Sequence, residues 1–146
     1  MSMPYIPDNE GVGGGPFLTM TILDVADQSF GQDDLEAGKT ACVVTGNNEV
    51  GKGSAGKRLF GKVVWVSTET LEGSTVPATC AVQARGVARF TTSSPTPQVN
   101  QMVEVAGDGT VRQASASADL PAGGPPVKGQ VIAVDTANNT CDVWLG

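Results

Sequence analysis

The sequence contains no histidine and only seven aromatic residues among its 146 residues. Without histidine, the chain lacks the usual general base of Ser–His and Cys–His pairs and a common ligand of zinc. Nine Lys and Arg against fifteen Asp and Glu give a net charge of −6, which is the wrong sign for binding nucleic-acid phosphates. We therefore expect that the protein is not an enzyme and binds no metal, no other cofactor and no nucleic acid. Catalysis by aspartates, by a metal held by carboxylates or by lysine remains formally open.

Long apolar runs and cysteine motifs are also missing. No apolar segment approaches the roughly 18 residues of a membrane-spanning helix, and the first residues lack the basic and apolar regions of a secretory signal. Cys42, Cys80 and Cys141 are widely spaced among apolar and β-branched neighbours. We predict three buried thiols in strands, in a protein made in a reducing cytoplasm with no membrane partner.

Glycine and proline are abundant, with nineteen and nine residues, as is typical of short strands joined by many turns. Segments rich in Val, Ile and Thr predict strands at 17–23, 40–45, 58–67, 79–91, 101–105, 110–113, 129–135 and 140–145. Asp108-Gly109 predicts a hairpin turn, and residues 24–38 can hold a single turn of helix. We predict an all-β fold, with residues 17–146 as a single β domain.

One β-hairpin pattern occurs twice in the sequence. GKVVWVST at 61–68 matches GQVIAVDT at 129–136 in its glycine, apolar and hydroxyl positions. Each segment is followed by a similar second strand, TCAV at 79–82 and TCDV at 140–143. This repetition predicts a barrel or sandwich with pseudo-symmetric halves, and chance similarity between two hairpins is the alternative.

Residues 1–16 predict an extended N-terminal arm. Their prolines and glycines exclude a helix, yet Met3, Tyr5 and Ile6 are apolar, as are Phe17 and Leu18 after them. We expect these side chains to dock the arm on a neighbouring molecule, for example as an added strand. An arm packed on its own barrel, or a free terminus, is the alternative.

Two glycine-rich patterns imitate phosphate-binding loops. Residues 46–52 resemble a P-loop, but Gly53 stands where the hydroxyl residue is required, and the next segment predicts a strand where a helix must begin. The GxGxxG pattern at 51–56 fails for the same reason. We predict instead a basic hairpin loop that either contacts an acidic partner or is solvated. Its cations are Lys52, Lys57 and Arg58.

The remaining motifs favour ordinary surface or core positions. Asn138-Asn139-Thr140 is a turn that happens to match the glycosylation pattern, and the acidic residues of the N-terminal third lack the spacing of a calcium loop. Trp65 and Trp144 lie within predicted strands, so we expect both in the core. A carbohydrate-binding β domain is an alternative function, but it would usually need an exposed aromatic platform.

Five segments, read in order, resemble a known family. They are residues 37–46, 56–66, 80–90, 99–113 and 129–145. Their sequence of strands and turns is similar to the capsid decoration, or cement, proteins of tailed bacteriophages. The resemblance covers about residues 37–146 and leaves the arm outside.

The resemblance implies a small β-barrel or β-tulip with the extended arm. It implies a structural virion protein on the exterior of a phage head, where it binds the major capsid protein, commonly as a homotrimer, and stabilises the mature shell. It implies no catalytic residues. The expected capsid or protomer contacts are Met3, Tyr5, Ile6, Phe17, Leu18, Lys52, Lys57 and Arg58. The alternatives are another phage structural component, such as a head fibre base or a tail protein, and the carbohydrate-binding domain.

Overall fold

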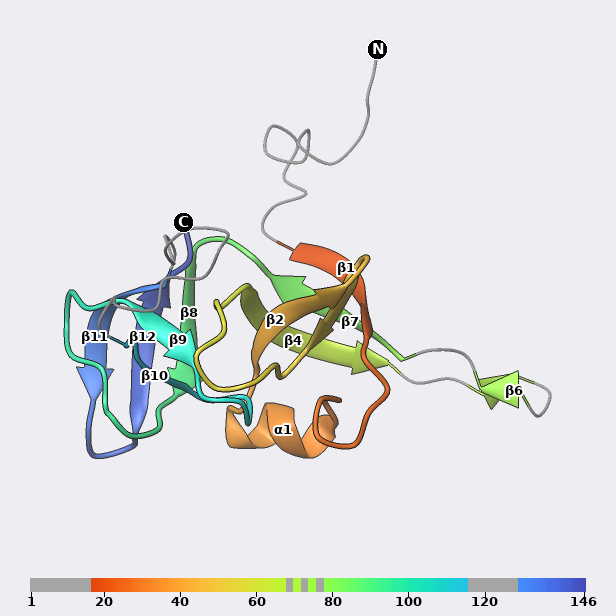
Figure 1. The fold of residues 1–146 in the computed structure, drawn as a ribbon, viewed down its shortest axis with the longest axis horizontal. Coiled ribbons are helices and arrows are strands. Elements are labelled where there is room, and N and C mark those ends of the chain that lie inside the picture. The colour runs from red at the N-terminus through yellow and green to blue at the C-terminus, as the bar shows by residue number, and fades with distance from the viewer. Residues whose placement is uncertain (1–16, 68–69, 72–73, 76–77, 116–128) are drawn as a thin grey trace, which may run out of the picture.

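The computed structural model describes residues 17–67, 70–71, 74–75, 78–115 and 129–146. Over these residues the protein is nearly all β, as predicted, with a single short helix (Figure 1). The elements are β1 (Phe17–Ile22), α1 (Gln32–Ala37), β2 (Ala41–Gly46), β3 (Glu49–Gly51), β4 (Gly61–Ser67), β5 (Thr70–Leu71), β6 (Ser74–Thr75), β7 (Thr79–Gln83), β8 (Val87–Thr91), β9 (Val103–Val105), β10 (Val111–Gln113), β11 (Gln130–Asp135) and β12 (Thr140–Trp144).

The first lobe, residues 17–83, is a closed barrel with the strand order β1-β3-β2-β4-β7. The β1–β3 pair is parallel, and the other pairs are antiparallel. Alternate residues of each strand point inward, so small and branched side chains fill the barrel. Its buried core consists of Met20, Ile22, Phe30, Cys42, Val50, Val63, Cys80 and Val82. The predicted barrel is therefore confirmed.

The second lobe, residues 87–144, contains a three-stranded sheet, β11-β12-β8, and a hairpin, β9–β10. Two isolated bridges join the sheet to the hairpin: Met102 pairs with Gln130, and Thr92 pairs with Val111. The five strands thus follow one another around a second core, and Figure 1 shows this lobe beside the first.

The two lobes have the same strand pairing, residue by residue. In the β4–β7 hairpin, Val66 lies opposite Cys80, and the register shifts between Val63 and Trp65. In the β11–β12 hairpin, Val134 lies opposite Cys141, and the register shifts between Val131 and Ala133. The predicted hairpin repeat is therefore confirmed, and the two hairpins also share a β-bulge at the same position.

The equivalence extends beyond the hairpin to the other strands. Met20 of β1 lies opposite Cys80, as Phe90 of β8 lies opposite Cys141. The parallel contact of Ile22 with Val50 corresponds to that of Thr92 with Val111. The pair Ala41–Lys62 corresponds to the bridge Met102–Gln130. The described chain is therefore a tandem of two barrel-like units.

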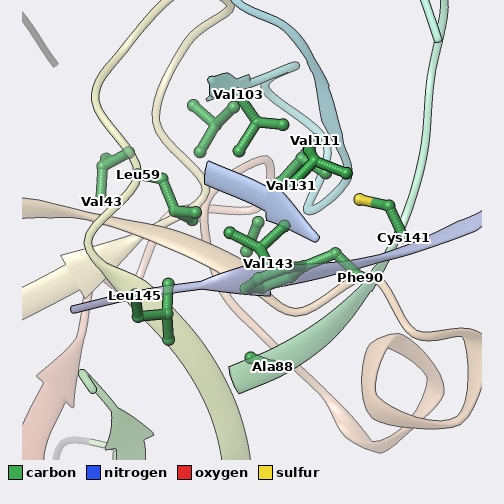
Figure 2. Close-up of a cluster of buried hydrophobic side chains, with 12 residues drawn as sticks. Val43, Leu59, Ala88, Phe90, Val103, Val111, Val131, Cys141, Val143 and Leu145 are labelled. Atoms are coloured by element: carbon green, nitrogen blue, oxygen red, sulfur yellow. The ribbon is translucent and has the colours of Figure 1, made fainter. Parts of the chain in front are cut away.

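Strand β2 supplies side chains to both cores. Cys42 lies in the core of the first lobe, whereas its neighbours Ala41 and Val43 point the other way and lie in the second core. Leu59, from the loop before β4, joins them there (Figure 2). The second lobe therefore completes its core with residues of the first.

Local sequence explains the single helix and its ends. Asp34 accepts a hydrogen bond from the Gly31 N–H at 3.0 Å, and so satisfies a donor at the N-terminus of α1. Gly38 ends the helix with a φ of 74°, a conformation that glycine adopts without strain. Residues 24–38 thus hold the short helix that the sequence allowed.

The structure also corrects three sequence predictions about strands. Residues 46–52, the P-loop look-alike, contain the turn at 47–48 and the strand β3 of the β2–β3 hairpin, and β3 was not predicted. Residues 58–60 lie in a loop, because Leu59 leaves the barrel to enter the second core. The predicted strand 79–91 is two strands, separated at 84–86 where the chain passes between lobes.

We predict that Val63→Ala and Val131→Ala destabilise the protein by similar amounts. Both side chains are buried at equivalent positions, so each loses the same two methyl groups from a packed core. The expected cost is about 1.5–3 kcal/mol each, from the range for large-to-small core substitutions. Urea unfolding should show one transition in both variants because the lobes share β2. Two separate transitions would contradict the shared core.

The three cysteines are buried, as predicted, and should be inert in the folded protein. Burial raises the pKa of Cys80 to about 11 and that of Cys141 to about 12, so almost no thiolate forms at pH 8. Cys42 donates to the Gly61 carbonyl at 3.4 Å. A chromogenic disulfide reagent should label no thiol in native protein and all three in denaturant. Fast labelling without denaturant would show that a core opens readily.

Candidate interaction surface

The two tryptophans are exposed, which corrects the prediction that they lie in the core. Trp65 is 56% exposed and Trp144 is 51% exposed. In β12 the side chains of Cys141 and Val143 point inward, so the alternation of the strand turns Trp144 outward. In β4 the bulge after Val63 places Trp65 on the outer face.

On the second lobe, Trp144 belongs to an outer surface with a mixed character. It lies opposite Val87 of β8, which is 52% exposed. In the next outward pair, Arg89 and Asp142 form a two-point ion pair, with Nε–Oδ1 at 2.7 Å and Nη2–Oδ2 at 3.1 Å. The Arg89 hydrogen bond holds the pKa of Asp142 below its usual range. An apolar pair and a charged pair thus lie side by side.

On the first lobe, the equivalent strands carry a second group of outward side chains. Phe17 of β1 lies opposite Gln83 of β7, and Gln83 lies opposite Lys62 of β4. Phe17 is 49% exposed, and it corresponds to Val87, the first residue of β8, which is also exposed. The two lobes therefore expose an apolar side chain at the same place in the fold.

These outer surfaces meet at the junction of the lobes. The Gln83 amide donates to the Val87 carbonyl at 3.0 Å, and so crosses from one lobe to the next. Burial lowers the pKa of Lys62, the charge of Arg89 lowers it further, and the charge of Asp142 acts in the opposite sense. Lys62 is therefore close to the ion pair of the second lobe.

We call the outward side chains of these strands, on both sides of the lobe junction, the junction face. It consists of Phe17, Lys62, Trp65, Gln83, Val87, Arg89, Asp142 and Trp144. It combines exposed aromatic side chains with arginine, a composition typical of the energetic centre of protein interfaces. Exposed apolar patches of this kind mark binding surfaces.

A small hollow of about 80 Å³ lies beside the junction face on β11 and β12. Its charged groups already have partners: Asp142 binds Arg89, and Asp135 accepts hydrogen bonds from Ala137 and Asn138. The hollow is far smaller than the cavities of about 300–1,000 Å³ that hold most small ligands. Within the described part of the chain, no group of His, Cys, Asp or Glu side chains could hold a metal ion.

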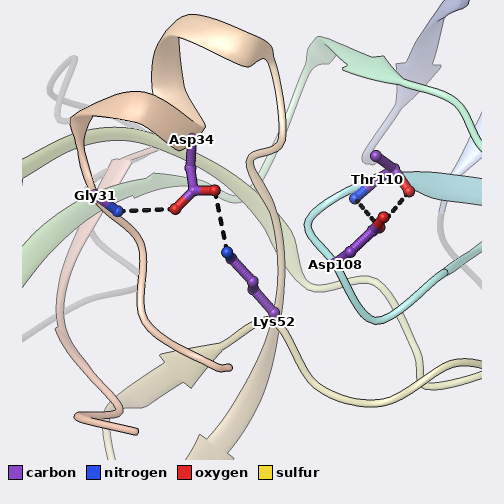
Figure 3. Close-up of polar contacts among 5 residues, drawn as sticks. All are labelled: Gly31, Asp34, Lys52, Asp108 and Thr110. Carbon is purple, nitrogen blue, oxygen red and sulfur yellow. Dashed lines mark hydrogen bonds and ion pairs between the residues drawn. The ribbon is translucent and has the colours of Figure 1, made fainter. Parts of the chain in front are cut away.

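The predicted contact residues lie in several different places. Leu18 is half-buried against the first core, because β1 is a strand of the barrel. Lys52 forms an ion pair with Asp34 at 3.0 Å (Figure 3) and lies 5.7 Å from the centre of the Phe30 ring. Lys52 therefore has intramolecular partners, and the prediction that it contacts another protein stays untested.

The basic loop at 52–60 is present, but the prediction that it closes a hairpin is wrong, because it joins β3 to β4 and these strands are not paired with each other. The loop also contacts the second lobe. Lys57 and Arg58 are exposed on it. Its backbone pairs with β9: the Gly56 N–H donates to the Val105 carbonyl, and the Val105 N–H donates to the Lys57 carbonyl. The arm residues Met3, Tyr5 and Ile6 lie outside the described residues.

The β9–β10 hairpin turn follows the chemistry that its sequence predicted. Asp108 accepts hydrogen bonds from the backbone N–H and the hydroxyl of Thr110 (Figure 3). Gly107 and Gly109 adopt φ values of 101° and 92°. A side chain at Gly109 would place its Cβ 2.5 Å from the Lys39 carbonyl oxygen, so glycine is required where this turn meets the first lobe.

Comparison with protein-family models, curated proteins and solved structures gave no match to this chain. The resemblance to decoration proteins therefore depends on the sequence segments alone. Among the helices in the described ranges, none is long and apolar enough to cross a membrane.

Sequence reasoning missed most of the junction face. The alternation of Cys141, Val143 and Leu145, all buried, would have placed Trp144 outward if it had been applied to β12. Trp65 offered no such signal, because a bulge cannot be recognised from the sequence of β4 alone. The proximity of Lys62 to Arg89 follows only from how the lobes pack.

We predict that stability falls in acid partly through Asp142. The pKa of Asp142 is lower in the folded protein than in the unfolded chain. Its ion pair therefore stabilises the fold fully above the unfolded pKa of about 3.9, and this stabilisation is lost as the pH falls through the lower folded pKa. Asp142→Asn should therefore lower the melting temperature at pH 7 but hardly change it at the lowest pH. Thermal melts from pH 7 to pH 2 measure this, with the exposed Asp24→Asn as control. If Asp142→Asn lowers the melting temperature by the same amount at every pH, the ion pair does not have the proposed role in stability.

Proposed function

We propose that this protein is a structural component of a bacteriophage virion that binds the outer surface of the capsid and stabilises the mature head. The junction face is the observation that supports this proposal most directly. It exposes two tryptophans, Phe17 and Val87, which another protein would cover in an assembled particle.

Charge and sequence resemblance support the same proposal. The net charge of −6 disfavours a role on packaged DNA, whereas it is compatible with the outside of the shell. The segments between 37 and 146 resemble decoration proteins. The partner is then the major capsid protein, and the site of action is the exterior of the head after synthesis in the host cytoplasm.

A homo-oligomer, with a trimer favoured, would account for firm attachment. When several linked copies bind a repeated surface, each further contact forms at a high effective concentration. Modest interfaces can then add up to a stable clamp without a large contact area for each chain. A head fibre base or a tail protein would use the same face in a different assembly, and a tail-tube protein would form rings or longer polymers in solution.

A carbohydrate-binding domain is the second candidate, and one observation now favours it. Trp65 and Trp144 were expected in the core, and their exposure supplies the aromatic platform that this function would need. Arg89 and Asp142 lie beside Trp144 and offer polar groups. Binding to a glycan array that is lost in Trp144→Ala would support this candidate.

Cosedimentation with phage capsids tests the proposed function. Expanded capsids that lack the protein should pull it into the pellet, and capsids already saturated with it should not. The double variant Trp65→Ala/Trp144→Ala should lose at least about tenfold in affinity, because interface tryptophans commonly contribute 2 kcal/mol or more. Val25→Ala, which changes another exposed apolar residue on the first lobe, serves as control. No cosedimentation of the unaltered protein would refute the function.

A further inference from the structure

The junction face has a local charge opposite to that of the whole chain. Lys62 and Arg89 lie on it, and Arg85 is exposed in the link between the lobes. The acidic member of the face is Asp142, which is already paired with Arg89, and the charge of Asp135 next to the face also acts on Arg89. Three cations against these two carboxylates leave the region positive. Together with its tryptophans, the face is therefore suited to a partner that is apolar and acidic.

Residues 1–16 of this chain have that chemistry. They contain the apolar side chains of Met3, Tyr5 and Ile6, followed by the acids Asp8 and Glu10. They contain no lysine or arginine. Residues 1–16 are thus complementary to the junction face in both polarity and charge.

The length of the segment favours the face of another copy. Phe17 already lies on the junction face, and Trp65 is two strands away, a distance of about 10 Å at the usual strand spacing. Ten residues separate Ile6 from Phe17, and an extended chain of that length spans about 33–36 Å. These ten residues are longer than the distance from Phe17 to Trp65 on the same chain, and they are long enough to reach a neighbouring molecule.

We propose that residues 1–16 of one copy bind along the junction face of a second copy. Met3, Tyr5 and Ile6 cover the exposed tryptophans, and Asp8 and Glu10 face Lys62, Arg85 and Arg89. Because one copy gives the arm and another accepts it on a different surface, the arms are either exchanged reciprocally within a dimer or passed from copy to copy around a closed ring. This names the partner of the junction face; only the trimeric size of the assembly rests on the proposed function.

Molar mass in solution tests the proposal without any capsid. By light scattering, the full chain and the control Val25→Ala should be oligomers of one size. A chain that begins at Phe17, and the variant Trp65→Ala/Trp144→Ala, should be monomers with unchanged circular dichroism. An oligomer that survives removal of residues 1–16 would overturn the proposal. A full chain that is monomeric at all concentrations would overturn it too, including the case in which the arm covers its own face.

A peptide titration tests the contact itself. A synthetic peptide of residues 1–16, added to the chain that begins at Phe17, should shift the tryptophan emission to shorter wavelength as the indoles leave water. The same peptide with Asp8→Lys and Glu10→Lys should bind at least tenfold more weakly. Equal binding of both peptides, or no shift with either, would overturn the proposal. If the protein forms oligomers but does not cosediment with capsids, only the proposed function is refuted, and the contact between the arm and the junction face stands.

Discussion

The use of β2 by two cores is the constraint on which the rest of the structure depends. Cys42 points into the first barrel, and Ala41 and Val43 point into the second. A strand buried on both faces leaves little room for polar side chains, and the first half of β2 has none. Because the second lobe lacks a complete core of its own, the lobes are fixed against each other. The junction face exists only because that packing brings Lys62 close to Arg89.

The tandem arrangement explains how one chain builds such a surface. Both lobes keep the same pairing and the same bulge, so their inward positions are equivalent and are filled by similar residues, Val63 and Val131 among them. Their outward positions are free to differ. A tryptophan occurs on β4 in one lobe and on β12 in the other, and the linker between β7 and β8 brings these outer surfaces together.

The sequence predicted the repeated hairpin, the buried cysteines and the β class, because inward alternation and small core residues leave a clear pattern. It could not show that the repeat includes β1–β3 and β8–β10, since many equivalent residues there differ in type: Ile22 corresponds to Thr92, and Val43 corresponds to Glu104. The P-loop look-alike lies in a hairpin, and the short strand inside it was missed because glycines flank it. Exposure of Trp65 depends on a bulge, and the junction face depends on tertiary packing. Local sequence contains neither.

Native-state hydrogen exchange of two equivalent amides tests the central claim most directly. The Val63 N–H donates to the Thr40 carbonyl, and the Val131 N–H donates to the Gln101 carbonyl, each at 2.9 Å and each at the same place in its lobe. If the lobes share β2 as one core, both amides should exchange only through global unfolding and give the same free energy of opening. Free energies that differ by more than about 1.4 kcal/mol, a tenfold difference in opening, would show that the lobes unfold separately and would contradict the account.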